Sequence, residues 1–149
     1  MEDTYRHKGL RKQLIDSIRK KGISDENVLN AMMEVPRHFF LDKAFEEMAY
    51  QDQAMPIEEG QTISQPFTVA YQTQLLNVEK RMKVMEIGTG SGYQAAVLGV
   101  MGARVYTIER HEALYLKSKQ MLESLGLLNV RCYYGDGNIG LGEFALFDR

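Results

Sequence analysis

The sequence feature that most constrains the fold is a glycine-rich turn directly after an apolar strand sequence. Residues 84–93 read VMEIGTGSGY, with an acidic residue, Glu86, ahead of three glycines at alternate positions. In α/β proteins such a turn connects a parallel strand to a helix at the carboxyl end of the strand, where small ligands bind. Glycine lacks a Cβ, so it permits positive φ and close approach of a ligand. The turn therefore predicts an α/β fold with a ligand-binding edge, the alternative being a plain tight turn.

The spacing of the glycines narrows the choice of ligand. Gly88 and Gly90 fit the first two positions of the dinucleotide fingerprint, but Tyr93 stands at its third glycine position. The Glu86 carboxylate would repel a pyrophosphate at the helix N-terminus, whereas it would attract a ligand that carries an ammonium group. The pattern therefore favours S-adenosylmethionine over a nicotinamide dinucleotide as the cofactor.

Two further acidic residues follow the next two predicted strands. Glu109 closes the strand sequence at 104–108, 21 residues after Gly88, where a carboxylate reaches ribose hydroxyls in a βαβ unit. Asp136, followed by Gly137, comes after the third predicted strand and could accept a hydrogen bond from an adenine amino group. The alternatives are a solvated strand-end acid and an ordinary Asp-Gly turn. Because the carboxyl ends of parallel strands share one edge, we expect these carboxylates to converge on one ligand.

The chain divides into a helical segment at residues 1–77 and a partial cofactor-binding core at residues 78–149, which together form one domain. The first helix is expected to end near Gly22, the second to be capped by Ser24 and ended by Pro36, and the third to begin at Pro66. A loop-rich stretch is expected over residues 50–65. In the core, strands near residues 83–87, 104–108 and 129–134 should alternate with helices near 92–101 and 111–125, which predicts a parallel sheet.

The composition of the chain argues against nucleic acid, a membrane or a metal ion as a ligand. The 149 residues are 44% hydrophobic and 26% charged, as in an average soluble domain, and the net charge of −2 gives no reason to expect nucleic acid or a membrane as a partner. The single cysteine, Cys132, is expected to be a small buried residue of a strand and fits a reducing cytoplasm. Three scattered histidines and one cysteine predict no metal site. No signal-peptide or membrane-spanning pattern is present, so a cytoplasmic location is expected.

The segment GQTISQPF at residues 60–67 places polar groups just before a helix that begins with proline. The free backbone N–H groups at that helix end favour an anion, and the Ser64 hydroxyl could hydrogen-bond a carboxylate. Spacing alone favours a second interpretation, in which Ser64 caps the helix.

Three sequence blocks together resemble the protein-L-isoaspartate (D-aspartate) O-methyltransferases, over nearly the whole chain from about Leu10 to Arg149. The blocks are AMPI at 54–57 with GQTISQP at 60–66, EIGTGSGYQ at 86–94 and GDG at 135–137. The first block separates this family from other methyltransferases. The resemblance implies a Rossmann-like S-adenosylmethionine-dependent methyltransferase fold, preceded by an N-terminal helical and substrate-loop segment. It implies these site residues: Ser64 as catalytic, Thr62, Ile63 and Ser64 as substrate-binding, and Glu86, Gly88, Gly90, Glu109, Asp136 and Gly137 as cofactor-binding.

The implied reaction is protein repair: a methyl group moves from S-adenosylmethionine to the free α-carboxylate of an L-isoaspartyl residue in a damaged protein, leaving S-adenosylhomocysteine. The sequence departs from the family in two ways, because it stops where the fourth strand of the family begins and has Leu146 where proline is common. We therefore expect a C-terminally truncated form with an incomplete sheet, an exposed sheet edge and self-association through that edge. The alternatives are a methyltransferase for another carboxylate or small acceptor and a non-catalytic fragment that binds the cofactor.

Overall fold

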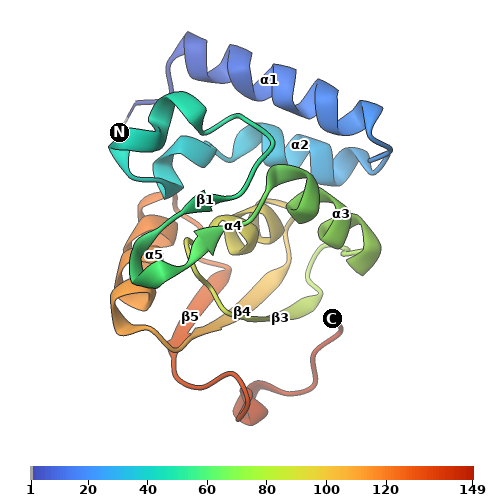
Figure 1. Cartoon of the computed structure of the whole chain (residues 1–149). Coiled ribbons are helices and arrows are strands. Elements are labelled where there is room, and N and C mark those ends of the chain that lie inside the picture. The colour runs from blue at the N-terminus through green and yellow to red at the C-terminus, as the bar shows by residue number, and fades with distance from the viewer. Residues whose placement is uncertain (1) are drawn as a thin grey trace.

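The computed structural model describes residues 2–149 and confirms an α/β architecture with a parallel sheet (Figure 1). Within these residues three parallel strands lie in the order β3 (Lys83–Ile87), β4 (Arg104–Glu109) and β5 (Val130–Tyr134). The crossovers are the helices α4 (Tyr93–Val100) and α5 (Glu112–Ser124). The predicted strands and helices of the core are therefore confirmed to within about two residues at each end.

The N-terminal segment forms helices that lie beyond α4, on the side away from the sheet (Figure 1). They are α1 (Tyr5–Lys20) and α2 (Glu26–Glu34), followed by the 3-10 turns η1 (Arg37–Phe40) and η2 (Lys43–Met48). The prediction that Ser24 caps the second helix is wrong. Asp25 is the N-cap, and its carboxylate accepts the N–H groups of Asn27 and Val28, while the Ser24 N–H donates to the Gln74 side chain.

The stretch at residues 50–65 contains more regular structure than the sequence predicted. A short antiparallel pair joins β1 (Met55–Pro56) to β2 (Thr62–Ile63), with the 3-10 turn η3 (Glu58–Gly60) between them. Figure 1 shows this hairpin reaching down beside α5. The helix α3 (Pro66–Leu76) then begins at Pro66, as predicted. The hairpin brings the polar segment before α3 to the edge of the sheet, which is why it matters for the site.

The helix α4 is the centre of the packing. Ala95, Ala96, Val97 and Leu98 are at most 1% exposed, because α4 is covered by the sheet on one side and by α2 on the other. Burying a Leu or Val side chain contributes roughly 1.5–3 kcal/mol. The α4 helix therefore fixes the glycine-rich turn at its N-terminus to the rigid interior of the protein.

The other face of the sheet is covered by the C-terminal residues. The Tyr106 ring stacks on Tyr133 and contacts the rings of Phe144 and Phe147 at centroid distances of 5.2 and 5.5 Å. Residues 148–149 run along the outer side of β3, where the Asp148 N–H donates to the Lys83 carbonyl (2.8 Å). The half-buried Cys132 lies in β5 as expected, and burial raises the pKa of its thiol to about 11.

Within residues 2–149, no helix combines the length and the apolar character that crossing a bilayer requires.

Candidate active site

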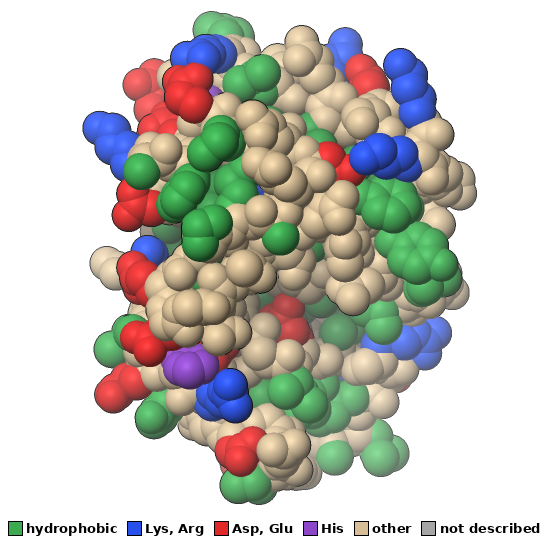
Figure 2. Space-filling view, in the orientation of Figure 1, with side chains coloured by type: hydrophobic (Ala, Val, Ile, Leu, Met, Phe, Trp, Pro, Cys, Tyr) green, Lys and Arg blue, Asp and Glu red, His purple; other side chains and the backbone are tan. Residues whose placement is uncertain are grey.

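The predicted site residues line two adjoining cavities at the carboxyl edge of the sheet. The first has a volume of about 350 Å³ and is lined by Glu109, Asp136 and Gly137, and the second, of about 260 Å³, by Ser64 and Glu86. Four residues line both cavities: Thr62, Ile87, Gly88 and Gly90. Figure 2 shows this face hollowed near its centre, with acidic atoms inside the hollow. The shared lining makes the two cavities one cleft, open between the hairpin and the ends of the strands.

The glycine-rich turn has the backbone conformation that its sequence predicts. Gly88 and Gly92 both have φ of +87°, a region that residues with a Cβ rarely adopt. The Gly88 N–H donates to the Ile108 carbonyl (2.8 Å), which holds the turn against the end of β4. A Cβ on Gly92 would lie 3.3 Å from the Ser118 Cβ of α5, so close helix packing is a second reason for glycine there.

Glu109 is 4% exposed and is bound to the glycine-rich turn through both carboxylate oxygens. The Gly90 N–H donates to Oε2 and the His111 N–H donates to Oε1, each at 2.9 Å. Each carboxylate oxygen has a second lone pair, so the carboxylate can still accept hydrogen bonds from a pair of hydroxyls in the cleft. The turn and β4 thus position the acid that the sequence placed at the end of the second strand of the core.

Glu86 is the most perturbed acid of the cleft. Burial raises the pKa of its carboxyl to about 7, the hydrogen bond from the Thr107 hydroxyl (2.5 Å) lowers it, and the nearby charge of Glu109 raises it. The Thr107 hydroxyl also lies 2.6 Å from the Thr89 hydroxyl. A partly buried carboxyl with this pKa binds either a proton or an external cation near neutral pH, because either removes the cost of an unpaired buried charge.

Asp136 lies at the same edge of the sheet. It also forms the ordinary Asp-Gly turn that was the alternative to a role in ligand binding. Its Oδ1 accepts the Asn138 N–H (2.9 Å), while the residue is exposed and lines the larger cavity. The turn engages one oxygen of the carboxylate, and the other oxygen is the one that can meet a ligand. Gly137 is packed tightly, since a Cβ there would lie 2.3 Å from the Ile87 Cγ2.

The three hairpin residues predicted to bind the substrate all line the cleft. Thr62 and Ser64 are exposed, whereas Ile63 is 2% exposed and pairs with Met55. The interpretation of Ser64 as the helix cap is wrong, because the N-cap position of α3 is Gln65 and no side chain at that position caps the helix.

The anion expected at the start of α3 is part of the protein. Asp52, which is distant in sequence, accepts the Phe67 N–H through Oδ1 (2.8 Å) and pairs with Lys21 (2.5 Å). The Ser64 hydroxyl is therefore not needed at the helix end, and Ser64 lines the cleft.

Sequence reasoning missed two residues behind the cleft. Thr107 is fully buried in β4 and contacts Glu86; a polar residue in the middle of the apolar strand sequence VYTIE was the signal available for it. Arg37 is fully buried in η1, and its Nη2 donates to the Ser64 carbonyl (2.9 Å). Nothing in the sequence around Arg37 points to Ser64.

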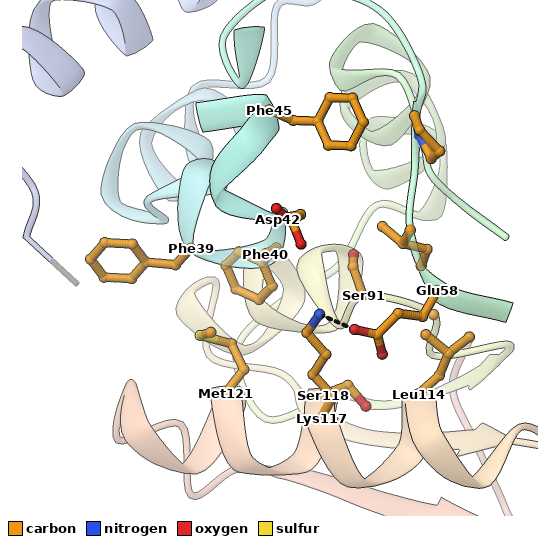
Figure 3. Close-up of a pocket in the computed structure, with 13 residues that line it drawn as sticks. Phe39, Phe40, Asp42, Phe45, Glu58, Ser91, Leu114, Lys117, Ser118 and Met121 are labelled. Carbon is orange, nitrogen blue, oxygen red and sulfur yellow. Dashed lines mark hydrogen bonds and ion pairs between the residues drawn. The ribbon is translucent and has the colours of Figure 1, made fainter. Parts of the chain in front are cut away.

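An apolar pocket of about 350 Å³ adjoins the cleft at Gly90 and Ser91 and lies between η1, the hairpin and α5 (Figure 3). Phe40 and Phe45 point into it, and Lys117 and Glu58 form an ion pair across its rim (2.6 Å). Ile57 lines this pocket beside the glycine-rich turn, since a Cβ on Gly90 would be 3.9 Å from its Cδ1. The pocket contains none of the three acids predicted for the cofactor, so we assign the site to the cleft.

The histidines are less scattered than the sequence suggested. His7 and His38 stack with ring centroids 3.9 Å apart, and one ligand atom from each lies within 4.8 Å of one from Asp3. The groups are already engaged within the protein: both Asp3 oxygens accept from Arg11, and His38 Nδ1 hydrogen-bonds the Tyr50 hydroxyl (2.7 Å). We interpret the cluster as a structural network that ties the N-terminus to η1.

Comparison with known proteins gives a consistent result over the whole chain. A family model described as protein-L-isoaspartate(D-aspartate) O-methyltransferase matches residues 9–149. A protein-L-isoaspartate O-methyltransferase from Christiangramia forsetii is 54% identical over 149 residues, which is all of this chain and 70% of the relative. One from Cytophaga hutchinsonii is 60% identical over 149 residues, or 67% of the relative. The chain thus spans about two thirds of the length of these relatives.

Solved structures agree with the sequence relatives. A protein-L-isoaspartate O-methyltransferase structure superposes with a TM-score of 0.83 at 33% identity, covering 92% of this chain and 45% of that one. A Plasmodium falciparum protein of the same family designation, in complex with S-adenosyl-L-homocysteine, gives a TM-score of 0.70 at 26% identity. That match covers 84% of this chain and 62% of the Plasmodium chain.

Proposed function

The chain belongs to the protein-L-isoaspartate(D-aspartate) O-methyltransferase family, and we propose that it methylates the free α-carboxylate of L-isoaspartyl residues in damaged proteins. The observation that carries this proposal is the single cleft in which Ser64 adjoins Glu86 and Glu109. The methyl ester then closes to a succinimide without further catalysis, and hydrolysis returns part of the residue to normal aspartate.

The donor set of the cleft fits S-adenosylmethionine, which supplies an electrophilic methyl group on a sulfonium. We assign Glu86 and Gly88 to the methionine end, because a carboxyl whose pKa is raised by burial gains from pairing with an ammonium group. We assign Glu109 to the ribose hydroxyls and Asp136, with Gly137, to the adenine. Gly90 exposes backbone where the cofactor passes close, and its N–H keeps the Glu109 carboxylate in place.

The acceptor chemistry explains why the cleft needs no catalytic base. A free α-carboxylate has a pKa near 4, so it is already ionised and nucleophilic at neutral pH. We propose that the Ser64 hydroxyl donates a hydrogen bond that orients this carboxylate, and that Thr62 and Ile63 position the peptide backbone. Holding the acceptor oxygen in line with the methyl group can supply several kcal/mol of the barrier. An anion and a sulfonium neutralise each other as they react, so a site that excludes water favours the step.

The experiment that tests this function compares two matched peptides, one isoaspartyl and one aspartyl, in methyl transfer from labelled S-adenosylmethionine. Label on the isoaspartyl peptide alone is the expected result. Label on both peptides, or on an unrelated carboxylate with equal efficiency, would instead favour a different acceptor. Binding of S-adenosylhomocysteine without transfer to either peptide would favour a cofactor-binding fragment.

Ser64→Ala is the matched variant for the assigned role. We expect methyl transfer to the isoaspartyl peptide to fall at least about ten-fold, because one hydrogen bond to a charged group is worth roughly 1.5–3 kcal/mol. Binding of S-adenosylhomocysteine should be unchanged, since Glu86 and Glu109 lie on other elements. Unchanged turnover in this variant would show that the assignment of Ser64 is wrong.

We further propose the cytoplasm as the location, isoaspartyl proteins and peptides as the substrates, and self-association of the 149 residues through the outer edge of β3. Residues 148–149 hydrogen-bond that edge at Lys83 and Met85, whereas Ile87 at its carboxyl end is 67% exposed. Sedimentation over a range of concentrations should reveal dimers or larger species. A sharp melt of a monomer at every concentration would contradict this.

A further inference from the structure

We propose that Arg37 is the positioning residue that gives the Ser64 end of the cleft its preference for a carboxylate. This inference rests on the proposed function and names the source of positive charge for the acceptor. The lining of the Ser64 cavity, all of it within the described residues, includes Glu86 but no Lys, Arg or His. Arg110 and His111 line the adjoining Glu109 cavity instead, so the Ser64 end of the cleft lacks a compensating charge on its own surface.

Arg37 supplies that charge from directly behind the hairpin. Its side chain is 0% exposed, and its Nη2 donates to the Ser64 carbonyl at 2.9 Å. The same guanidinium donates through Nε to the Ala49 carbonyl (3.0 Å) and through Nη2 to the Gln53 carbonyl (3.4 Å). It thus fastens the segment that carries Ser64 at three points, over residues 49–64.

The charge of Arg37 is not neutralised by a contacting acid. Among residues 2–149, Arg37 forms no ion pair, its Nη1 has no hydrogen-bond partner, and its other close contact is the ring of Tyr93, 4.9 Å from the guanidinium carbon. The nearby Asp52 is occupied by Lys21 and by the start of α3. Burial lowers the pKa of Arg37, but a guanidinium stays protonated at any pH near neutral.

A buried, unpaired cation acts at longer range than an exposed one, because little water screens it. Its field reaches the cleft through the Ser64 peptide group, which the hydrogen bond to the carbonyl also polarises. Arg37 therefore both fixes Ser64 and favours an anion beside it, and it does so without touching the substrate.

The test measures charge preference rather than turnover. With S-adenosylhomocysteine bound, calorimetry compares an isoaspartyl peptide with its neutral α-carboxamide analogue, and we expect the carboxylate to bind about ten-fold more tightly to the wild-type chain. In Arg37→Gln the ratio should fall to about one while S-adenosylhomocysteine binding changes less than about two-fold. If the Arg37→Gln variant keeps the ten-fold affinity ratio, the inference is overturned. It is also overturned if the wild-type chain methylates the isoaspartyl peptide but binds the carboxylate and carboxamide peptides equally.

Arg11→Gln is the matched control, because Arg11 is also buried in the N-terminal segment but contacts Asp3 and Tyr50 rather than the hairpin. It should lower stability and leave the carboxylate preference intact. If Arg37→Gln does not fold, Arg37→Lys decides the point: a retained charge predicts a retained ratio with weaker binding of both peptides, and loss of the ratio would refute the role. Failure of the proposed function is separate, since it shows as a wild-type chain that does not methylate the isoaspartyl peptide.

Discussion

Replacing Thr107 by valine should weaken cofactor binding by changing the ionisation of Glu86. The Thr107 hydroxyl donates to Glu86 Oε2 at 2.5 Å and holds down a pKa that burial has raised to about 7. Valine keeps the shape of threonine but cannot donate. Losing a hydrogen bond to a charged group costs roughly 1.5 kcal/mol, which corresponds to about one unit of pKa. The ionised fraction of Glu86 at pH 7 then falls from about one half to about one tenth.

The affinity for S-adenosylhomocysteine should follow that fraction, because its ammonium group pairs with the ionised carboxylate. Calorimetry should show about five-fold weaker binding to Thr107→Val at pH 7. At pH 8 the binding should be only about two-fold weaker, because Glu86 is then about nine-tenths ionised in the wild type and about half ionised in the variant. Thr107→Ser keeps the hydroxyl and should bind as the wild type does. Equal affinities of wild type and Thr107→Val at pH 7 with the same pH dependence would refute the link between Thr107 and Glu86.

Three further substitutions test the packing and electrostatics around the site. Glu86→Gln should stabilise the ligand-free protein by about 3 kcal/mol at pH 8 and weaken S-adenosylhomocysteine binding. Because burial raises the pKa of Glu86 from 4.5 to about 7 in the folded state, the wild type loses stability as pH rises across that window, which urea titrations at pH 5 and 8 would detect. Asp52→Ala removes the acceptor of the Phe67 N–H and should cost about 1–2 kcal/mol in urea unfolding, whereas Asp52→Asn should cost less. Gly99→Ala places a Cβ 2.7 Å from the Val130 Cγ2, so thermal melting should show a net loss of about 1 kcal/mol despite the better helix propensity of alanine.

The core of the fold was predictable because its signals are local. The strand sequences at β3 and β4 are short and largely apolar with an acid at or next to the carboxyl end, and the glycine spacing fixes the turn between β3 and α4. Each of these patterns spans ten residues or fewer, and the parallel topology follows from their alternation. The cofactor acids were predictable for the same reason, since the ends of successive strands meet at one edge whatever the rest of the chain does.

The remaining features depend on contacts between distant residues. The two-residue strands β1 and β2 are too short to show a period, and the hairpin is held by its packing on α5 instead. Spacing alone favoured Ser64 as a helix cap because a cap is a local motif, whereas the actual partner of the α3 N-terminus, Asp52, comes from a different loop. Arg37 hydrogen-bonds Ser64, which is 27 positions away in the sequence. From sequence alone, a buried arginine cannot be told from an exposed one, because the carbonyl groups that it binds come from distant residues.

The arrangement of charge around the cleft follows from the chemistry of the proposed reaction. The cationic methyl donor and the anionic carboxylate acceptor attract each other, so the protein does not need its own charges to bring them together. It must, however, prevent the donor from binding in the acceptor site and the acceptor from binding in the donor site. The acids Glu86 and Glu109 come from β3 and β4, while the buried Arg37 comes from the N-terminal segment and hydrogen-bonds carbonyls between residues 49 and 64. Because opposite charges sit on separate elements, the two ends of the cleft can select their ligands independently. Glu86→Gln should therefore change binding of S-adenosylhomocysteine alone and Arg37→Gln the carboxylate preference alone, with additive effects in the double variant.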